Sequence, residues 1–188
     1  MKYKGIIKGD NCSLESLARA DESEIEVFRS LFNENSIAEF LNQEYLKNKT
    51  VPKIRKWIAK KIVNPVEVWY VIKWKNRYIG YICFKWREHY NEACEISTAI
   101  VKEFRGLKLG YESTKLLIDY LISLNNFKYI AAYVYLTNKK AEKNLKKIGF
   151  RRANRLHKVI TKEFYWNGGS GNGDRRYNLM VIYSGNKT

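Results

Sequence analysis

Cysteine is scarce in this 188-residue chain, and its three copies are not spaced as a binding motif requires. Cys12, Cys83 and Cys94 are odd in number and show neither the paired spacing of a zinc site nor a disulfide framework. The sequence therefore predicts reduced thiols, no bound metal and a cytoplasmic protein. Cys94 also lacks a histidine at motif spacing, so we assign it no role as a nucleophile.

Long apolar runs are missing as well. No stretch approaches the roughly 18 to 20 continuous apolar residues of a membrane span. Residues 1–8, with the sequence MKYKGIIK, lack the apolar centre of a signal peptide. We therefore expect no membrane partner and a location in the cytosol.

Two common fingerprints of nucleotide binding are also missing, the Walker lysine with its serine or threonine and the dinucleotide glycine pattern. A glycine-rich segment does occur at 167–174, but it joins two expected strands and no helix follows it, so we interpret it as a hairpin connection. The two histidines, His89 and His157, lie in a turn and in a basic segment far from the motifs described below. We assign neither a role.

Acidic residues are few relative to basic ones: 19 Asp and Glu stand against 35 Lys and Arg, which gives a formal net charge of +16. Such an excess favours acidic partners, whether a phosphorylated cofactor, a nucleotide-linked substrate, RNA or a membrane surface. A lysine-coated surface in water explains the same charges equally well. The length and the 45% apolar content are typical of a single domain, here residues 1–188.

Helical periodicity dominates the first third of the chain. Asp21 is suited to be the N-cap of the first helix, with Glu24 completing a capping box, and Pro52 is suited to the first turn of the third. The expected helices cover residues 21–33, 36–48 and 52–63.

The middle of the chain is rich in β-branched and aromatic residues. Strands are expected at 66–74, 77–86 and 93–101, joined first by a tight turn at Lys75-Asn76, and should form an antiparallel meander. A helix at 110–125 and a strand at 127–136 follow. A strand, a helix and a strand at this spacing predict a crossover after which the sheet becomes parallel.

The last third continues this pattern. Asn138 is expected to cap a short helix that has Leu145 on its apolar face and ends at Gly149. We interpret the lysines of its other face as a solvated surface. A long hairpin is expected over 151–166 and 176–183. The predicted fold class is α+β, with a mixed, mostly antiparallel sheet of about seven strands and about four to five helices.

Residues 101–111 join the third strand of the meander to the long helix. A helix start offers backbone N–H groups without intrahelical partners, and the helix dipole adds partial positive charge there. Gly106 and Gly110 let the backbone approach phosphate oxygens, while Arg105 and Lys108 supply full positive charges. This turn therefore predicts a site for a di- or polyphosphate.

These segments, in this order, resemble the GNAT superfamily of acyl-CoA N-acyltransferases, and within it the RimJ/RimL type. The resemblance covers about 66–183. The family's pyrophosphate loop, Arg/Gln-x-x-Gly-x-Gly/Ala, is matched at Arg105 and Gly110, with Lys108 in the place of the middle glycine. The next family motif, an Asn after a strand and a Gly-Phe pair closing the following helix, is matched at Asn138 and at Gly149-Phe150.

The resemblance implies acetyl-CoA as co-substrate and no metal. Ile100 and Val101 would pair through their backbone with the pantetheine arm, as an added strand does, and an amide near Val101 would stabilise the oxyanion. Asn138 would orient the arm from the opposite side. The pyrophosphate would bind at the turn formed by Arg105, Gly106, Leu107, Lys108, Leu109, Gly110 and Tyr111.

The resemblance also suggests catalytic residues. Glu95, on the strand that leads into the turn, is the leading candidate for the general base; alternatively, it is a carboxylate paired with a lysine. Many relatives have a tyrosine acid where this chain has Leu145, so that role is vacant or has moved. Tyr133 and Tyr135 lie on the strand before Asn138 and could reach the cleft, although aromatic strand residues often serve only packing. We retain Tyr135 as a catalytic candidate.

The acceptor is the least specified part. The resemblance implies that residues 21–63 and 155–177 shape its pocket, with Trp57, Trp86, Tyr165 and Trp166 either lining it or packing in the core. RimJ/RimL relatives modify protein N-termini, ribosomal proteins, antibiotics and amino sugars. The sequence thus predicts direct acetyl transfer to a primary amine by a monomer or a homodimer. The alternative is a non-catalytic RNA- or ribosome-binding module on the same fold.

Overall fold

A computed structural model describes residues 3–18, 20–41, 43–86, 93–153 and 177–184. The chain divides into two compact units, which we describe one at a time. The first unit contains Met1–Phe84 and Thr98–Leu117, and the second contains Lys85–Ser97 and Ile118–Thr188. A single domain over 1–188 stays a prediction.

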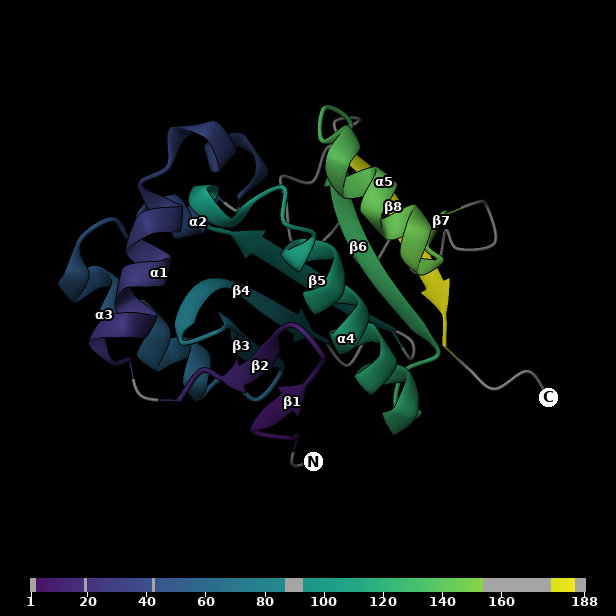
Figure 1. Cartoon of the computed structure of the whole chain (residues 1–188), viewed down its shortest axis with the longest axis horizontal. Coiled ribbons are helices and arrows are strands. Elements are labelled where there is room, and N and C mark those ends of the chain that lie inside the picture. Colours follow the sequence, from purple (N-terminus) through teal and green to yellow (C-terminus); the bar gives the residue numbers. More distant parts are fainter. Residues whose placement is uncertain (1–2, 19, 42, 87–92, 154–176, 185–188) are drawn as a thin grey trace. The chain divides into compact units, whose positions relative to one another are not determined.

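Eight strands and five α-helices are described, and the mixed sheet confirms the expected fold class. In the first unit the strand order is β1-β2-β3-β4, followed by the end of β5 from Thr98 onward (Figure 1). Strand β4 is buried along most of its length and β3 at its centre, as the runs of valine, isoleucine and aromatic residues indicate. The bounds are Ile6–Lys8 for β1, Ser13–Ser16 for β2, Glu67–Trp74 for β3, Arg77–Lys85 for β4 and Ala93–Ile100 for β5.

The two short strands β1 and β2 were not expected from the sequence. They pair antiparallel with each other, and β2 pairs antiparallel with β3. Each has one buried side chain, Ile7 in β1 and Leu14 in β2, so neither shows an alternating pattern long enough to identify. Their pairing partners, rather than their own residues, determine that they are strands.

The helices of the first unit largely follow their sequence signals. Helix α1 covers Glu22–Phe32 and α3 covers Val51–Ile62, as expected. The prediction of one helix at 36–48 is wrong. This segment forms two shorter elements, the 3-10 helix η1 (Asn35–Phe40) and the four-residue α2 (Gln43–Leu46). Leu41 has an extended backbone, with φ −92° and ψ 151°, and this interrupts the helical hydrogen bonds.

The N-terminus of α1 matches its signal in part. The Asp21 carboxylate accepts a hydrogen bond from the Glu24 amide at 2.9 Å, which makes Asp21 the N-cap. Glu24 itself accepts from the Ala18 amide at 3.3 Å. The Glu24 carboxylate therefore ties the preceding segment to the helix.

Aromatic side chains form the centre of the first unit. The Phe28 ring lies 5.0 Å from the Trp57 ring, 6.4 Å from Trp69 and 5.6 Å from Tyr81 between centroids. Such pairs each contribute about 0.5–1.5 kcal/mol beyond the area that they bury. Trp57 is only 5% exposed, so it is a core residue in this unit.

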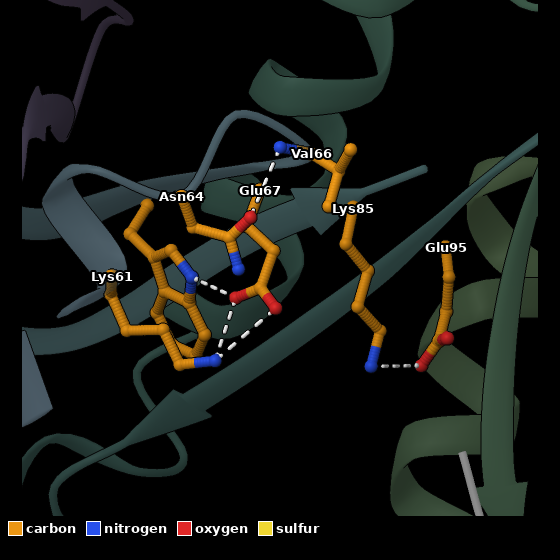
Figure 2. Close-up of polar contacts among 7 residues, drawn as sticks. Lys61, Asn64, Val66, Glu67, Lys85 and Glu95 are labelled. Carbon is orange, nitrogen blue, oxygen red and sulfur yellow. Dashed lines mark hydrogen bonds and ion pairs between the residues drawn. The ribbon is translucent and has the colours of Figure 1, made fainter. Parts of the chain in front are cut away.

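A charged pair, Lys61 and Glu67, contacts the Trp69 side chain of this aromatic cluster, and Figure 2 shows the pair. The Lys61 ammonium of α3 lies 2.8 Å from the Glu67 carboxylate of β3, and both side chains are mostly buried. Glu67 also accepts from the Trp69 indole at 2.8 Å, and the ammonium lies 5.5 Å from the Trp69 ring centroid. Lys61 is thus tolerated on the apolar side of α3 because its charge is paired.

In the second unit the strand order is β5-β6-β8-β7. Strand β6 (Tyr129–Tyr135) pairs parallel with β5, which confirms the crossover through α4 (Leu109–Leu124). Strand β8 (Tyr177–Tyr183) pairs antiparallel with β6 and with β7 (Arg151–Arg152). The loop of the expected hairpin lies outside the described residues.

Helix α5 (Lys139–Ile148) begins and ends as the sequence predicts. The Asn138 side chain accepts from the Ala141 amide at 3.1 Å, and Gly149 has φ +113°, the left-handed conformation that ends many helices. The helix lies along β6 and β8 (Figure 1), where a Cβ on Gly149 would be 3.3 Å from Ile182. Its exposed lysines confirm the expected solvated face: Lys139, Lys140, Lys143, Lys146 and Lys147.

Gly80 lies where the backbone at the end of β5 comes very close to β4. A Cβ at this position would lie 2.2 Å from the carbonyl oxygen of Ala99 and 3.1 Å from the Cα of Ile100, and both of these atoms belong to the backbone. We expect Gly80→Ala to lower the free energy of unfolding by about 1–3 kcal/mol in urea denaturation. Gly5→Ala is the matched control, because nothing lies within 4 Å of a Cβ there. Equal stabilities of the two variants would contradict this account of β4 and β5.

Candidate cofactor and catalytic site

The turn between β5 and α4 is held at its base by the buried side chain of Phe104. The 3-10 helix η2 covers Lys102–Phe104, and its Phe104 ring is buried and packs edge-on against Trp74, with 5.9 Å between centroids. Past this anchor, Leu107 is 52% exposed, and Gly106 and Lys108 are exposed too. The tip of the turn is therefore accessible while its base is fixed.

Two residues of the turn have a left-handed backbone. Gly106 has φ +88° and Lys108 has φ +62°. Glycine adopts this conformation without steric cost, whereas a lysine Cβ is crowded there. The Lys108 carbonyl accepts from the amides of Tyr111 at 2.9 Å and Glu112 at 3.0 Å, so this strained residue closes the first turn of α4.

The turn leaves a run of five backbone donors without protein partners. Within the described part of the chain, none of the amides from Gly106 to Gly110 donates a hydrogen bond to another residue. They lie at the N-terminus of α4, where the helix dipole favours negative charge. Successive backbone amides near residues of left-handed conformation are a common way for proteins to bind anions. The phosphate site expected from the sequence stays a prediction.

Gly110 faces the end of β5. A Cβ on Gly110 would lie 3.4 Å from the Ile100 side chain, which is ordinary van der Waals contact. Position 110 therefore accepts a methyl group and is crowded by anything larger on the Ile100 side.

Arg105 uses its charge differently from the sequence expectation. Its guanidinium donates to both carboxylate oxygens of Glu34, at 2.7 and 2.6 Å, and its Nε donates to the Ile100 carbonyl at 2.7 Å. The positive charge that we expected to face a phosphate is thus paired with a carboxylate of this chain. Lys108 keeps an exposed ammonium at the turn.

The backbone polar groups at Ile100 and Val101, which we expected to be open for pairing with the pantetheine arm, already form hydrogen bonds within the protein. The Val101 amide donates to the Ile79 carbonyl at 2.9 Å, and the Val101 carbonyl accepts from the Phe104 amide at 3.0 Å. The Ile100 carbonyl accepts from Arg105. These groups are therefore engaged within the first unit, and an oxyanion donor at Val101 would require the bond to Ile79 to break.

Glu95 lies on β5 in the second unit, paired in register with Ala131 of β6. Its carboxylate is 3.1 Å from the Lys85 ammonium of β4, and both side chains are less than one-fifth exposed (Figure 2). The sequence left open a catalytic base or an ion-pair partner of lysine, and the structure shows the ion pair.

Tyr135 and Asn138 also belong to the second unit. The Tyr135 and Tyr177 hydroxyls are hydrogen-bonded, and their rings lie 4.0 Å apart between centroids. The Asn138 amide donates to the Tyr135 carbonyl at 2.9 Å while its side-chain oxygen caps α5. Leu145, in the place of the family's tyrosine, is buried. The proposed contacts of Asn138 and Tyr135 with substrates stay predictions.

The three cysteines are buried and form no disulfide. Burial, together with the charge of Glu112, raises the pKa of the Cys12 thiol to about 11. Burial and the neighbouring Glu95 likewise raise the pKa of Cys94 well above its ordinary value. Both groups are therefore poor nucleophiles at neutral pH.

Other sequence candidates lie outside the described residues: His89, His157, Tyr165 and Trp166. Among the residues that the structure does describe, no group of three or more His, Cys, Asp and Glu side chains could hold a metal ion. In the same residues no helix has the length and apolar character to cross a membrane.

A family model described as "Acetyltransferase (GNAT) domain" matches residues 14–151. No curated protein gives a match to the sequence.

Several solved structures have a similar fold. RimL, a ribosomal L7/L12 alpha-N-protein acetyltransferase in complex with coenzyme A, has a TM-score of 0.71 and 17% identity, covering 95% of this chain and 97% of that one. A probable GNAT-family acetyltransferase from Chromobacterium violaceum has a TM-score of 0.74 and 16% identity, covering 97% and 88%. The microcin C7 self-immunity acetyltransferase MccE, in complex with acetyl-CoA and AMP, has a TM-score of 0.67 and 18% identity, covering 93% of each chain. At these identities the likeness shows the fold.

The left-handed backbone of Lys108 should lower the stability of the protein. Because a left-handed conformation costs a residue with a Cβ about 1–2 kcal/mol, we expect Lys108→Gly to raise the free energy of unfolding by about 1 kcal/mol. Lys102→Gly, at a position without positive φ, should lower it by about 0.5–1 kcal/mol. Chemical denaturation measures both. A loss of stability in Lys108→Gly equal to that in the control would show that residue 108 is not strained.

Proposed function

Because the chain belongs to the GNAT acetyltransferase family, we propose that it transfers the acetyl group of acetyl-CoA to a primary amine. The observation that carries the proposal is the run of unpartnered amides from Gly106 to Gly110 at the start of α4. A pyrophosphate needs several converging donors, and this turn supplies them from the backbone.

The residues of the turn fit this ligand in shape and charge. Gly106 and Gly110 carry no side chain that would block the approach of an oxygen, and the exposed Lys108 ammonium adds a full positive charge. The contribution of Arg105 is indirect, since its guanidinium is bonded to Glu34. In this proposal the backbone holds the pyrophosphate, and Lys108 strengthens the binding.

The chemistry makes modest demands on the protein. An alkylammonium has a pKa of roughly 10 and must lose a proton before its nitrogen has a lone pair for attack. The nitrogen then forms a bond to the acetyl carbonyl carbon, the carbon–sulfur bond breaks, and CoA leaves as a thiolate that takes up a proton. The products are an N-acetyl amide and CoA, with no covalent enzyme intermediate.

Glu95 and Tyr135 are the side chains that we propose for the proton transfers. Glu95 would take the proton from the amine, directly or through water, and Lys85 would orient its carboxylate. Tyr135, with its hydroxyl held by Tyr177, would give a proton to the leaving thiolate. Both residues belong to the second unit.

The acceptor class is proposed only as a primary amine. RimL acts on a protein N-terminus and MccE confers immunity to a microcin, so peptide amines and antibiotic-like amines are the first to test. The non-catalytic RNA-binding alternative has no support from the family match, and we do not favour it. A cytoplasmic location and a monomeric or dimeric state remain expectations.

The proposed function is tested by binding and by turnover. Acetyl-CoA should bind saturably in calorimetry, and peptides with free N-termini, polyamines and amino sugars should be screened for the release of free CoA thiol. Absence of acetyl-CoA binding would overturn the proposal. If acetyl-CoA binds but no amine releases the CoA thiol, only the cofactor-binding part of the proposal stands and the transfer reaction is overturned for these amines.

Gly110 provides a direct prediction about the pyrophosphate site. Gly110→Asp should reduce acetyl-CoA affinity at least about a hundredfold, because it places a carboxylate beside the phosphates in a region of low exposure. Gly110→Asn is the matched control, since it has nearly the same size and no charge. Calorimetry at a temperature below both melting transitions gives the comparison. Equal losses in the two variants would indicate crowding against Ile100 instead of repulsion of an anion.

Glu95 provides a prediction about catalysis. Glu95→Gln should lower kcat by about a hundredfold or more and leave the Kd for acetyl-CoA unchanged, because the base acts only in the chemical step. Lys85→Met separates the two roles of the carboxylate: if the ion pair is purely structural, both variants lose stability and neither loses kcat.

A further inference from the structure

We infer that Glu34 is a positioning residue for the cofactor turn: by holding the Arg105 guanidinium, it keeps the amides of Gly106 to Gly110 exposed toward acetyl-CoA. The inference rests on the proposed function, and it assigns a role to a residue that no sequence motif identifies. Glu34 occupies the N-cap position of η1, and it lies 71 positions before Arg105 in the sequence.

The contact is a bidentate ion pair within the first unit. Each carboxylate oxygen of Glu34 accepts from a different terminal nitrogen of Arg105, at 2.7 and 2.6 Å. The two side chains are 14% and 29% exposed, so water screens the pair much less than it screens an ordinary surface pair. Ser36 bonds to the same carboxylate. This geometry fixes the plane of the guanidinium.

With its plane fixed, Arg105 connects three segments. Its terminal nitrogens bond to Glu34, its Nε bonds to the carbonyl of Ile100 at the end of β5, and its own amide donates to the Lys102 carbonyl at 3.2 Å. Gly106, the first left-handed residue, follows immediately. The direction in which the chain leaves Arg105 therefore determines where the five amides point.

The charges favour a positioning role over direct binding. A diphosphate beside a free arginine would be attracted to it, but the Glu34 carboxylate cancels the charge of Arg105. Burial alone would raise the pKa of Glu34, yet the hydrogen bonds from Arg105 and Ser36 and the charges of Arg105 and Lys102 bring it below its ordinary value. Glu34 is therefore ionised at neutral pH and keeps Arg105 in the pair.

The experiment compares Glu34→Gln with a matched pair elsewhere in the same unit. Glu22 also bonds to an arginine, Arg55, at 2.8 Å, and that arginine also donates to a backbone carbonyl, that of Ala20. Glu34→Gln should raise the Kd and the KM for acetyl-CoA by about tenfold and leave kcat within about twofold. Glu22→Gln should change none of these values.

A double-mutant cycle shows whether Glu34 acts through Arg105. Arg105→Gln alone should weaken acetyl-CoA binding, and adding Glu34→Gln to it should have little further effect. Losses that multiply across the two positions would overturn the inference, as would an unchanged Kd in Glu34→Gln. If Glu34→Gln unfolds near the assay temperature, Glu34→Asp keeps the charge but shortens the reach, and it must show the same rise in KM.

The wild-type protein distinguishes this inference from the proposed function. Wild-type protein that fails to bind acetyl-CoA would overturn both. Wild-type protein that binds and transfers acetyl normally, together with an equally competent Glu34→Gln variant, would overturn the role of Glu34 alone.

Discussion

The end of β5 is the point on which the turn before α4 depends. Ile100 is fixed there from three directions: its carbonyl accepts from Arg105, its side chain faces Gly110, and its Cα lies close to Gly80 of β4. The next residue, Val101, donates to Ile79 and so joins the end of β5 to β4. The start of the turn is therefore positioned by backbone contacts that require a glycine at position 80. Side chains add two further contacts, the Phe104 ring against Trp74 and the Arg105 guanidinium on Glu34.

Much of the fold was predictable because it depends on local signals. The helices α1 and α5 have side-chain caps close to their apolar pattern, and α3 has a proline in its first turn. The long strands have enough β-branched and aromatic residues to be identified. The prediction failed for β1, β2 and the helix at 36–48. A strand with a single buried side chain has no periodicity of its own, and a helical pattern does not show that one residue, Leu41, is extended.

For the candidate site, the sequence predicted a glycine-containing turn followed by the start of a helix, and α4 begins at Leu109, close to the expected residue 110. The left-handed conformation of Gly106 and Lys108 was not predicted. The pairing of Arg105 with Glu34 was not predicted either, because two residues 71 positions apart show no pattern that relates them. The contact of Glu95 with Lys85 lies between neighbouring strands, whose register a sequence alone does not give, so the sequence left Glu95 open between a base and an ion-pair partner.

Lys108 exchanges stability of the turn for charge. Its Cβ costs about 1–2 kcal/mol in a left-handed conformation, a cost that glycine at the same position would avoid. In the proposed function the exposed ammonium stands beside the bound anion, so the same residue weakens the empty turn and strengthens the occupied one. The same conflict would confront anyone who redesigned the turn for durability.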